Sequence, residues 1–182
     1  MSSASITVQS LFEEPDERWE RDDEWSFPKS VAIGWPLPNA PTPQDFRDFS
    51  AKYFAAMRAV CTVVSDNKIE DYVAGYPIIF LFRHSVELAL KAVIMHQAGN
   101  GASGHDLSKL SAKVSGLPAW AHAWIIELHH LDERSTGLRY PDTEVGFFEA
   151  GALMSDWLER TEKLHSVLIE LSQTHLSKKD FA

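Results

Sequence analysis

Apolar residues recur every three or four positions along most of the chain after residue 43, and this spacing is typical of amphipathic helices. Pro43 stands where a proline favours a helix start, and Asp66 and Asn67 are residues typical of a helix end. Further helices are predicted over residues 70–97, 105–114, 118–133 and 152–175. Since no stretch shows the alternation of a β-strand, we expect an all-α bundle of four main helices plus a short one.

The residues before the first helix differ in composition from the rest. They are rich in serine, then acidic, then rich in proline, with no sustained helical period. Several large aromatics lie between Trp19 and Trp35, which is unusual for a freely disordered tail. We expect an irregular arm over residues 1–43, either packed through its aromatics or solvated with one or two anchors, and a helical domain over 44–182.

The charge is strongly negative and unevenly distributed. The formal net charge of −9 argues against a broadly basic surface that follows a nucleic-acid backbone. Eight acidic residues and two arginines lie between Glu13 and Glu24, so this stretch accounts for most of the charge. The remaining chain is closer to neutral and leaves room for a local basic pocket.

Three features predict the cellular compartment. Cys61 is the single cysteine, which excludes an internal disulfide and suits a reducing environment. The N-terminus lacks the basic and apolar regions of a secretory signal. The longest apolar run, Tyr76 to Phe82, is too short to span a bilayer. We therefore expect a soluble cytoplasmic protein that does not bind a membrane.

The most apolar predicted helix carries a compact set of ionisable residues. Arg83, Glu87 and Lys91 are spaced by four, so on a helix they form one ladder of alternating charge, and His84 lies beside it. This pattern indicates either a polar site within the bundle or a well-paired charged face.

Two further polar clusters follow along the chain. In the first, Gly104-His105-Asp106-Leu107, the aspartate is suited to starting a helix. The second, over residues 132–142, contains Arg134, Arg139 and Tyr140. Its arginines could bind a phosphate bidentately, or they could pair with the neighbouring carboxylates in an ordered turn.

Several other kinds of site are disfavoured by the spacing of the motifs. The glycine-rich loop over residues 99–104 lacks the strand and the Gly-Lys-Ser/Thr of a phosphate-binding loop, and no nucleophile elbow occurs. His129 and His130 are adjacent, so on a helix they point about 100° apart and do not chelate one ion. We predict no metal site and no cofactor.

Taken in order, three motifs resemble those of a known family. Arg-His-x-x-Glu-Leu-x-Leu-Lys begins at Arg83, Gly-His-Asp-Leu-x-x-Leu begins at Gly104, and Arg-Tyr-Pro begins at Arg139. Over roughly residues 45–175 the chain resembles the HEPN (higher eukaryotes and prokaryotes nucleotide-binding) superfamily. The resemblance implies a bundle of four or five helices, usually homodimeric, with a cleft at the dimer interface. Many members are metal-independent ribonucleases of toxin–antitoxin, abortive-infection or CRISPR-linked systems, and others are binding modules.

The chain departs from the motif that the resemblance implies for nuclease members. They use an arginine followed, after four to six residues, by a histidine at the turn before the last long helix, and no histidine follows Arg134 at that spacing. Arg160 and His165 match formally but lie within a predicted helix, and we interpret them as a solvated flank. Since RNA cleavage without metal needs an acid or base that titrates near neutrality, another histidine would have to act beside Arg134.

We therefore expect a HEPN-like protein that binds RNA or a phosphorylated nucleotide ligand, with nuclease activity divergent or lost. One alternative is a metal-independent endoribonuclease of a toxin–antitoxin or phage-defence system, and another is a non-enzymatic subunit whose acidic arm contacts a basic partner. The expected partners are a second copy of the chain and an antitoxin or defence-system protein. The candidates for catalysis are His84, His105, His130 and Arg134. The expected ligand-binding residues are Arg83, His84, Glu87, Lys91, His105, Arg134, Arg139 and Tyr140.

Overall fold

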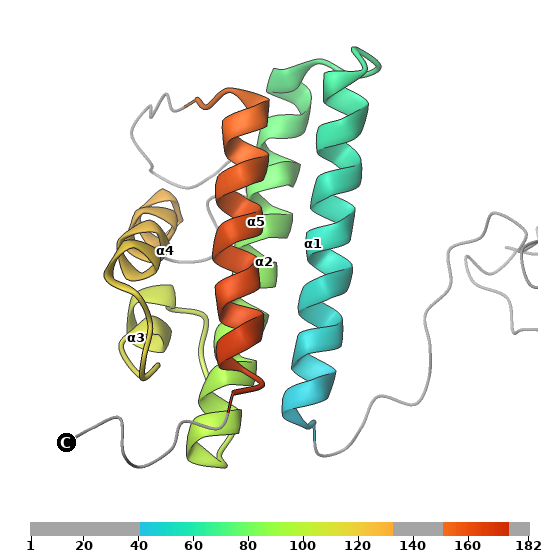
Figure 1. Cartoon of the computed structure of the whole chain (residues 1–182). Coiled ribbons are helices and arrows are strands. Elements are labelled where there is room, and N and C mark those ends of the chain that lie inside the picture. Colours follow the sequence, from blue (N-terminus) through green and yellow to red (C-terminus); the bar gives the residue numbers. More distant parts are fainter. Residues whose placement is uncertain (1–40, 133–150, 175–182) are drawn as a thin grey trace, which may run out of the picture. The chain divides into compact units, whose positions relative to one another are not determined.

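The computed structural model describes residues 41–132 and 151–174 (Figure 1). Within these ranges every regular element is a helix, which confirms the expected all-α bundle of four main helices and a short one. The helices are α1 (Pro43–Ser65), α2 (Asp71–Ala98), α3 (Leu107–Ser111), α4 (Ala119–Leu131) and α5 (Met154–Leu171). The predicted arm over residues 1–43 lies almost wholly outside the described residues, and its boundary stays a prediction.

The long helix α2 lies at the centre of the bundle, as its nearly continuous apolar sequence predicts. It contacts α1, α3 and α5, while α4 packs on α3 (Figure 1). Residues around the circumference of α2 are buried, including charged ones as well as the apolar majority. Any polar group on its middle turns must therefore find its partners inside the protein.

One apolar core joins all five helices. Each of them contributes at least one fully buried or nearly fully buried large side chain to the same cluster. Burying such a side chain stabilises a protein by about 1.5–3 kcal/mol, so this cluster fixes how the helices pack. The largest of its fully buried apolar side chains are those of Met57, Leu90, Leu107, Leu110, Ile125, Leu164 and Leu168.

The start of α1 is specified by its local sequence. The Thr42 hydroxyl accepts a hydrogen bond from the backbone N–H of Asp45, whose carboxylate accepts one from the backbone N–H of Thr42 at 2.7 Å. This reciprocal capping box satisfies donors that the helix leaves unpaired, and Pro43 occupies the first helical position. The predicted start at Pro43 is confirmed.

The single cysteine is part of the α1 face that packs on the core. Cys61 is fully buried, and its thiol donates to the Met57 sulfur at 3.5 Å, one helical turn earlier. Burial raises the pKa of the Cys61 thiol, so the protonated form prevails at neutral pH.

The predicted short helix over residues 105–114 is wrong in its extent, since α3 covers only Leu107–Ser111. The Asp106 side chain accepts from the backbone N–H of Lys109, so Asp106 is the N-cap and His105 lies in the preceding loop. The last helix is also shorter than predicted, because Leu153 and Ser172 are its caps.

No helix among the described residues is both long enough and apolar enough to cross a membrane.

Two glycines on α2 allow a matched test of backbone conformation. Gly99, the C-cap, has a φ of 71°, whereas Gly75 lies inside the helix without a positive φ. Neither would bring a new Cβ within 4 Å of another group. We expect Gly99→Ala to lower the free energy of unfolding by about 1–2 kcal/mol, because a side chain is strained in the left-handed region. We expect Gly75→Ala to raise it by about 0.5–1 kcal/mol through its helix propensity.

Urea denaturation at neutral pH measures both effects. Equal changes of the same sign in the free energy of unfolding of the two variants would show that the left-handed conformation of Gly99 does not require a glycine.

Candidate functional site

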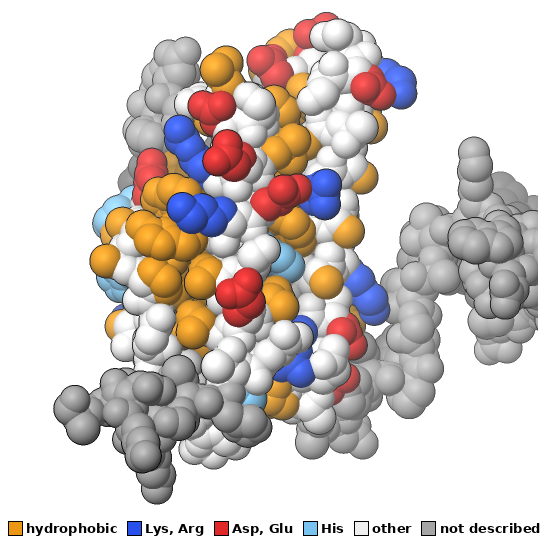
Figure 2. All heavy atoms as spheres, in the orientation of Figure 1, with side chains coloured by type: hydrophobic (Ala, Val, Ile, Leu, Met, Phe, Trp, Pro, Cys, Tyr) orange, Lys and Arg blue, Asp and Glu red, His pale blue; other side chains and the backbone are white. Residues whose placement is uncertain are grey.

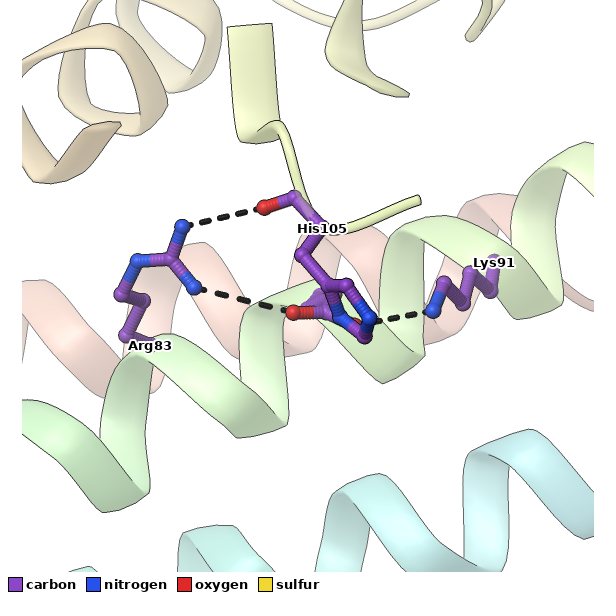
Figure 3. Close-up of polar contacts among 4 residues, drawn as sticks. Arg83, Lys91 and His105 are labelled. Atoms are coloured by element: carbon purple, nitrogen blue, oxygen red, sulfur yellow. Dashed lines mark hydrogen bonds and ion pairs between the residues drawn. The ribbon is translucent and has the colours of Figure 1, made fainter. Parts of the chain in front are cut away.

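A buried carboxylate on α2 is the centre of the most concentrated polar site in the described residues. Glu87 Oε1 lies 2.8 Å from Lys91 Nζ and 2.8 Å from His105 Nδ1, while Glu87 Oε2 lies 3.6 Å from Arg83 Nη1. We refer to these four residues as the Glu87 cluster. Figure 3 shows Arg83 and Lys91 on α2 on either side of the carboxylate and His105 reaching it from the loop before α3.

The local sequence accounts for this convergence. The i, i+4 spacing of α2 places Arg83 and Lys91 one turn to each side of Glu87, so the predicted pairing within the ladder is confirmed. The second motif contributes His105, because Gly104 has a φ of 89° and Asp106 begins α3 directly afterwards. Arg83 also donates from Nη2 to the backbone carbonyl of His105 at 3.0 Å, which attaches this loop to α2.

Glu87 is ionised at neutral pH although it is almost fully buried. Burial on its own would raise the pKa of the carboxyl, but contacts with Lys91 and His105 outweigh it and hold the pKa below its ordinary value. The side chains of Arg83 and Lys91 are only 5% and 12% exposed. Removing one charge from such a buried group leaves its partners uncompensated. The cluster thus contains two buried cations and one buried anion.

His105 is the member of the cluster that faces solvent, with 68% of its side chain exposed. An ionised carboxylate can only accept hydrogen bonds, so the Nδ1 that faces Glu87 must carry a proton. The other ring nitrogen, Nε2, is therefore the basic one in the neutral form. A carboxylate that holds a histidine in one tautomer is a common element of acid–base sites.

His84 is next to Arg83 in the sequence but faces a different part of the protein. Its ring makes an edge contact with Tyr53 of α1, with centroids 4.4 Å apart, and stacks at 6.1 Å on Phe80. Burial lowers the pKa of His84. Successive residues on a helix point about 100° apart. The His84 ring is therefore not among the groups that the structure shows in contact with Glu87.

Of the third cluster only Asp132, the buried C-cap of α4, lies within the described residues. His130 is exposed there, with its ring 5.6 Å from that of His129, and His129 Nε2 lies 3.9 Å from the Asp106 carboxylate. The second motif therefore contacts α2 through His105 and approaches α4 through Asp106. The other candidates, Arg134, Arg139 and Tyr140, lie outside the described residues, and their position relative to Glu87 stays a prediction.

A second polar cluster, around His165 of α5, was missed at the sequence level. His165 Nε2 lies 3.1 Å from the hydroxyl of buried Ser50, and its ring stacks on Phe54 at 4.1 Å. The interpretation of this residue as a solvated flank is wrong, because His165 lies four residues after buried Thr161 and three before buried Leu168. This helical spacing in the sequence could have predicted that His165 lies on the buried face of α5.

The formal pair of Arg160 and His165 does not form a common site. Five positions along a helix turn the second side chain about 140° away from the first. Arg160 instead lies 3.8 Å from Asp156 on the exposed side of α5, whereas His165 faces α1.

Glu87→Gln tests the electrostatic balance of the cluster. At pH 7 we expect the substitution to lower the free energy of unfolding by about 3–5 kcal/mol, because it removes the carboxylate that faces two largely buried cations. A carboxyl whose folded pKa is lowered stabilises the fold above its ordinary pKa of 4.5 and loses that contribution as the pH falls through the folded value. The difference between the wild type and the variant should therefore shrink at acid pH.

Denaturation at several pH values measures this difference. The control is Glu127→Gln, which removes an exposed carboxylate of α4. A gap between the variant and the wild type that stays constant from pH 7 to pH 3 would refute the assignment of an ionised Glu87.

Comparison with known protein families identifies the fold. A family model described as HEPN domain matches residues 76–172, a segment that contains the Glu87 cluster and runs through nearly all of α5. Comparisons with curated proteins and with solved structures returned no match. Since the matched segment covers just over half of the chain, this protein belongs to the HEPN domain family.

Proposed function

We propose that this HEPN protein binds RNA or a phosphorylated nucleotide at the Glu87 cluster, and that nuclease activity is divergent or lost. The observation that carries the proposal is the placement of two cationic side chains, Arg83 and Lys91, beside an ionised carboxylate, with His105 exposed at the edge of the cluster. Arg83 and Lys91 place cationic groups in this part of an otherwise acidic chain, which supports the binding of an anion. Membership of the HEPN family supports a function related to nucleotides or RNA.

The residues of the cluster would have different roles in binding. His105 is the group that a phosphate can reach directly, because its side chain is mostly exposed. Arg83 and Lys91 are largely buried and act as positioning residues that fix Glu87, the loop and the local potential. Arg134 and Arg139, after α4, would add bidentate contacts to a phosphate, and Tyr140 would offer a face for base stacking.

A second candidate function, metal-independent RNA cleavage, is favoured by one observation. Glu87 holds Nδ1 of His105 protonated, which leaves Nε2 as the nitrogen able to take a proton from a ribose 2′-hydroxyl. An arginine such as Arg134 would then stabilise the charge that develops on the phosphorus centre. The remaining alternative, a partner-binding subunit that uses its acidic arm, depends on residues outside those described.

His105→Ala tests the binding site. We expect it to weaken the binding of a fluorescein-labelled single-stranded RNA by about tenfold or more, because it removes a hydrogen bond to a charged group. Fluorescence anisotropy at fixed ionic strength measures the affinity. His122→Ala is the matched control, since His122 is exposed on α4 and lies outside the Glu87 cluster.

The same proteins distinguish binding from cleavage. If the wild type degrades RNA in the presence of EDTA and His105→Ala does not, the ribonuclease is supported, whereas binding without cleavage supports the leading proposal. Equal RNA affinity of the wild type and His105→Ala would refute the binding proposal, and equal RNA degradation by the two proteins would refute a catalytic role of His105.

We further propose that the protein pairs with a second copy through the first turns of α2. Tyr72, Val73 and Tyr76 are 76%, 48% and 64% exposed there, on two adjacent turns. Exposed clusters of large apolar side chains are typical of protein–protein interfaces.

Tyr76→Glu should shift the protein towards the monomer, because the interface would have to bury an unpaired carboxylate. Multi-angle light scattering over a range of concentrations measures the mass. The control Ala123→Glu adds the same charge at an exposed position of α4, away from the first turns of α2. It should leave the mass unchanged. A wild type that is monomeric at every concentration would exclude this pairing.

A further inference from the structure

A groove between the first turns of α1 and the last turns of α5 lies apart from the Glu87 cluster. It is open to solvent and has a volume of about 400 Å³, and its lining includes Arg47, Asp48, His165 and Glu170. In Figure 2, histidine atoms are visible between α5 and α1, with acidic and basic side chains on both helices nearby. A volume of a few hundred cubic ångströms is that of a small-ligand site.

The hydrogen bonds under the groove determine the tautomer of His165. We assign the one hydroxyl proton of Ser50 to the Ser85 carbonyl at 2.9 Å, which makes the Ser50 oxygen the acceptor of the N–H at His165 Nε2, 3.1 Å away. Nε2 therefore carries the proton, and Nδ1 has a lone pair. Burial lowers the pKa of His165 to about 4, which keeps the ring neutral at physiological pH. The described residues place no hydrogen-bond donor at Nδ1.

The charged groups of the groove also favour a hydrogen-bond donor. Arg47 is engaged by the protein itself: Nη1 donates to the Ser172 carbonyl at 2.8 Å and Nη2 to the Gln44 side-chain carbonyl at 2.6 Å. Asp48 and Glu170 supply two carboxylates against this one guanidinium. Asp48 Oδ1 accepts a hydrogen bond from the Gln44 side-chain amide at 2.6 Å, which fixes this carboxylate at the groove, and the two carboxylates leave the charged side chains of the lining with a net negative charge.

We infer that this groove binds an organic cation, a protonated amine or guanidinium such as the end of a Lys or Arg side chain. One N–H of the ligand donates to His165 Nδ1, and Asp48 and Glu170 balance its charge. The stacking of His165 on Phe54 and the hydrogen bond from Nε2 to Ser50 hold the accepting nitrogen in place before the ligand arrives. The site is independent of RNA binding at the Glu87 cluster.

Nuclear magnetic resonance of the full chain with ¹⁵N-labelled histidine tests the inference. The probes are agmatine, as a free small cation, and the peptide acetyl-Gly-Arg-Gly-amide, as a protein-like source of the same group. The matched neutral probe is acetyl-Gly-citrulline-Gly-amide. Binding should shift the Nδ1 resonance of His165 for one or both cationic probes and not for the citrulline peptide. A response to agmatine alone indicates a metabolite site, and a response to the peptide indicates a partner protein.

Charge variants complete the test. Asp48→Asn and Glu170→Gln should each weaken binding of the cationic probe about two- to fivefold, as expected for a partly exposed ion pair. Glu159→Gln removes an exposed carboxylate of α5 outside the groove and should leave the affinity unchanged. The inference is overturned if no cationic probe moves the His165 resonance, if the citrulline peptide binds equally well, or if Mg²⁺ alone produces the same shift.

Discussion

The ionised carboxylate of Glu87 is the interaction on which the site depends. The central helix is buried around its circumference, so its cations can remain there only with a counter-charge and hydrogen bonds. Glu87 provides both, because one oxygen accepts from Lys91 and His105 and the other faces Arg83. Without it, Arg83 and Lys91 would lose the carboxylate that they share in the middle of α2.

The same carboxylate also fixes the loop before α3 against α2, a position that helix packing alone would not determine. His105 comes from the loop before α3, and its backbone carbonyl accepts from Arg83. Asp106, the next residue, caps α3 and approaches His129 at the end of α4. A short polar motif thus connects α2, α3 and α4.

Most of the fold could be predicted from the sequence, because helix periodicity is a local signal. The pairing of Arg83, Glu87 and Lys91 was predictable for the same reason, since one helix fixes their spacing. The contact of His105 with Glu87 was not, because it joins residues 18 positions apart through a loop. The position of His165 against Ser50, 115 residues away, likewise depends on how α5 packs on α1.

The buried thiol described on α1 has a practical consequence. Thiol-directed reagents attack the thiolate, and Cys61 is both fully covered and held in its protonated form. It is also the one cysteine in the sequence. A new cysteine on an exposed helix position would therefore react selectively in the native protein. Pairs of spin or fluorescent labels could then measure distances across the bundle without first replacing the native residue.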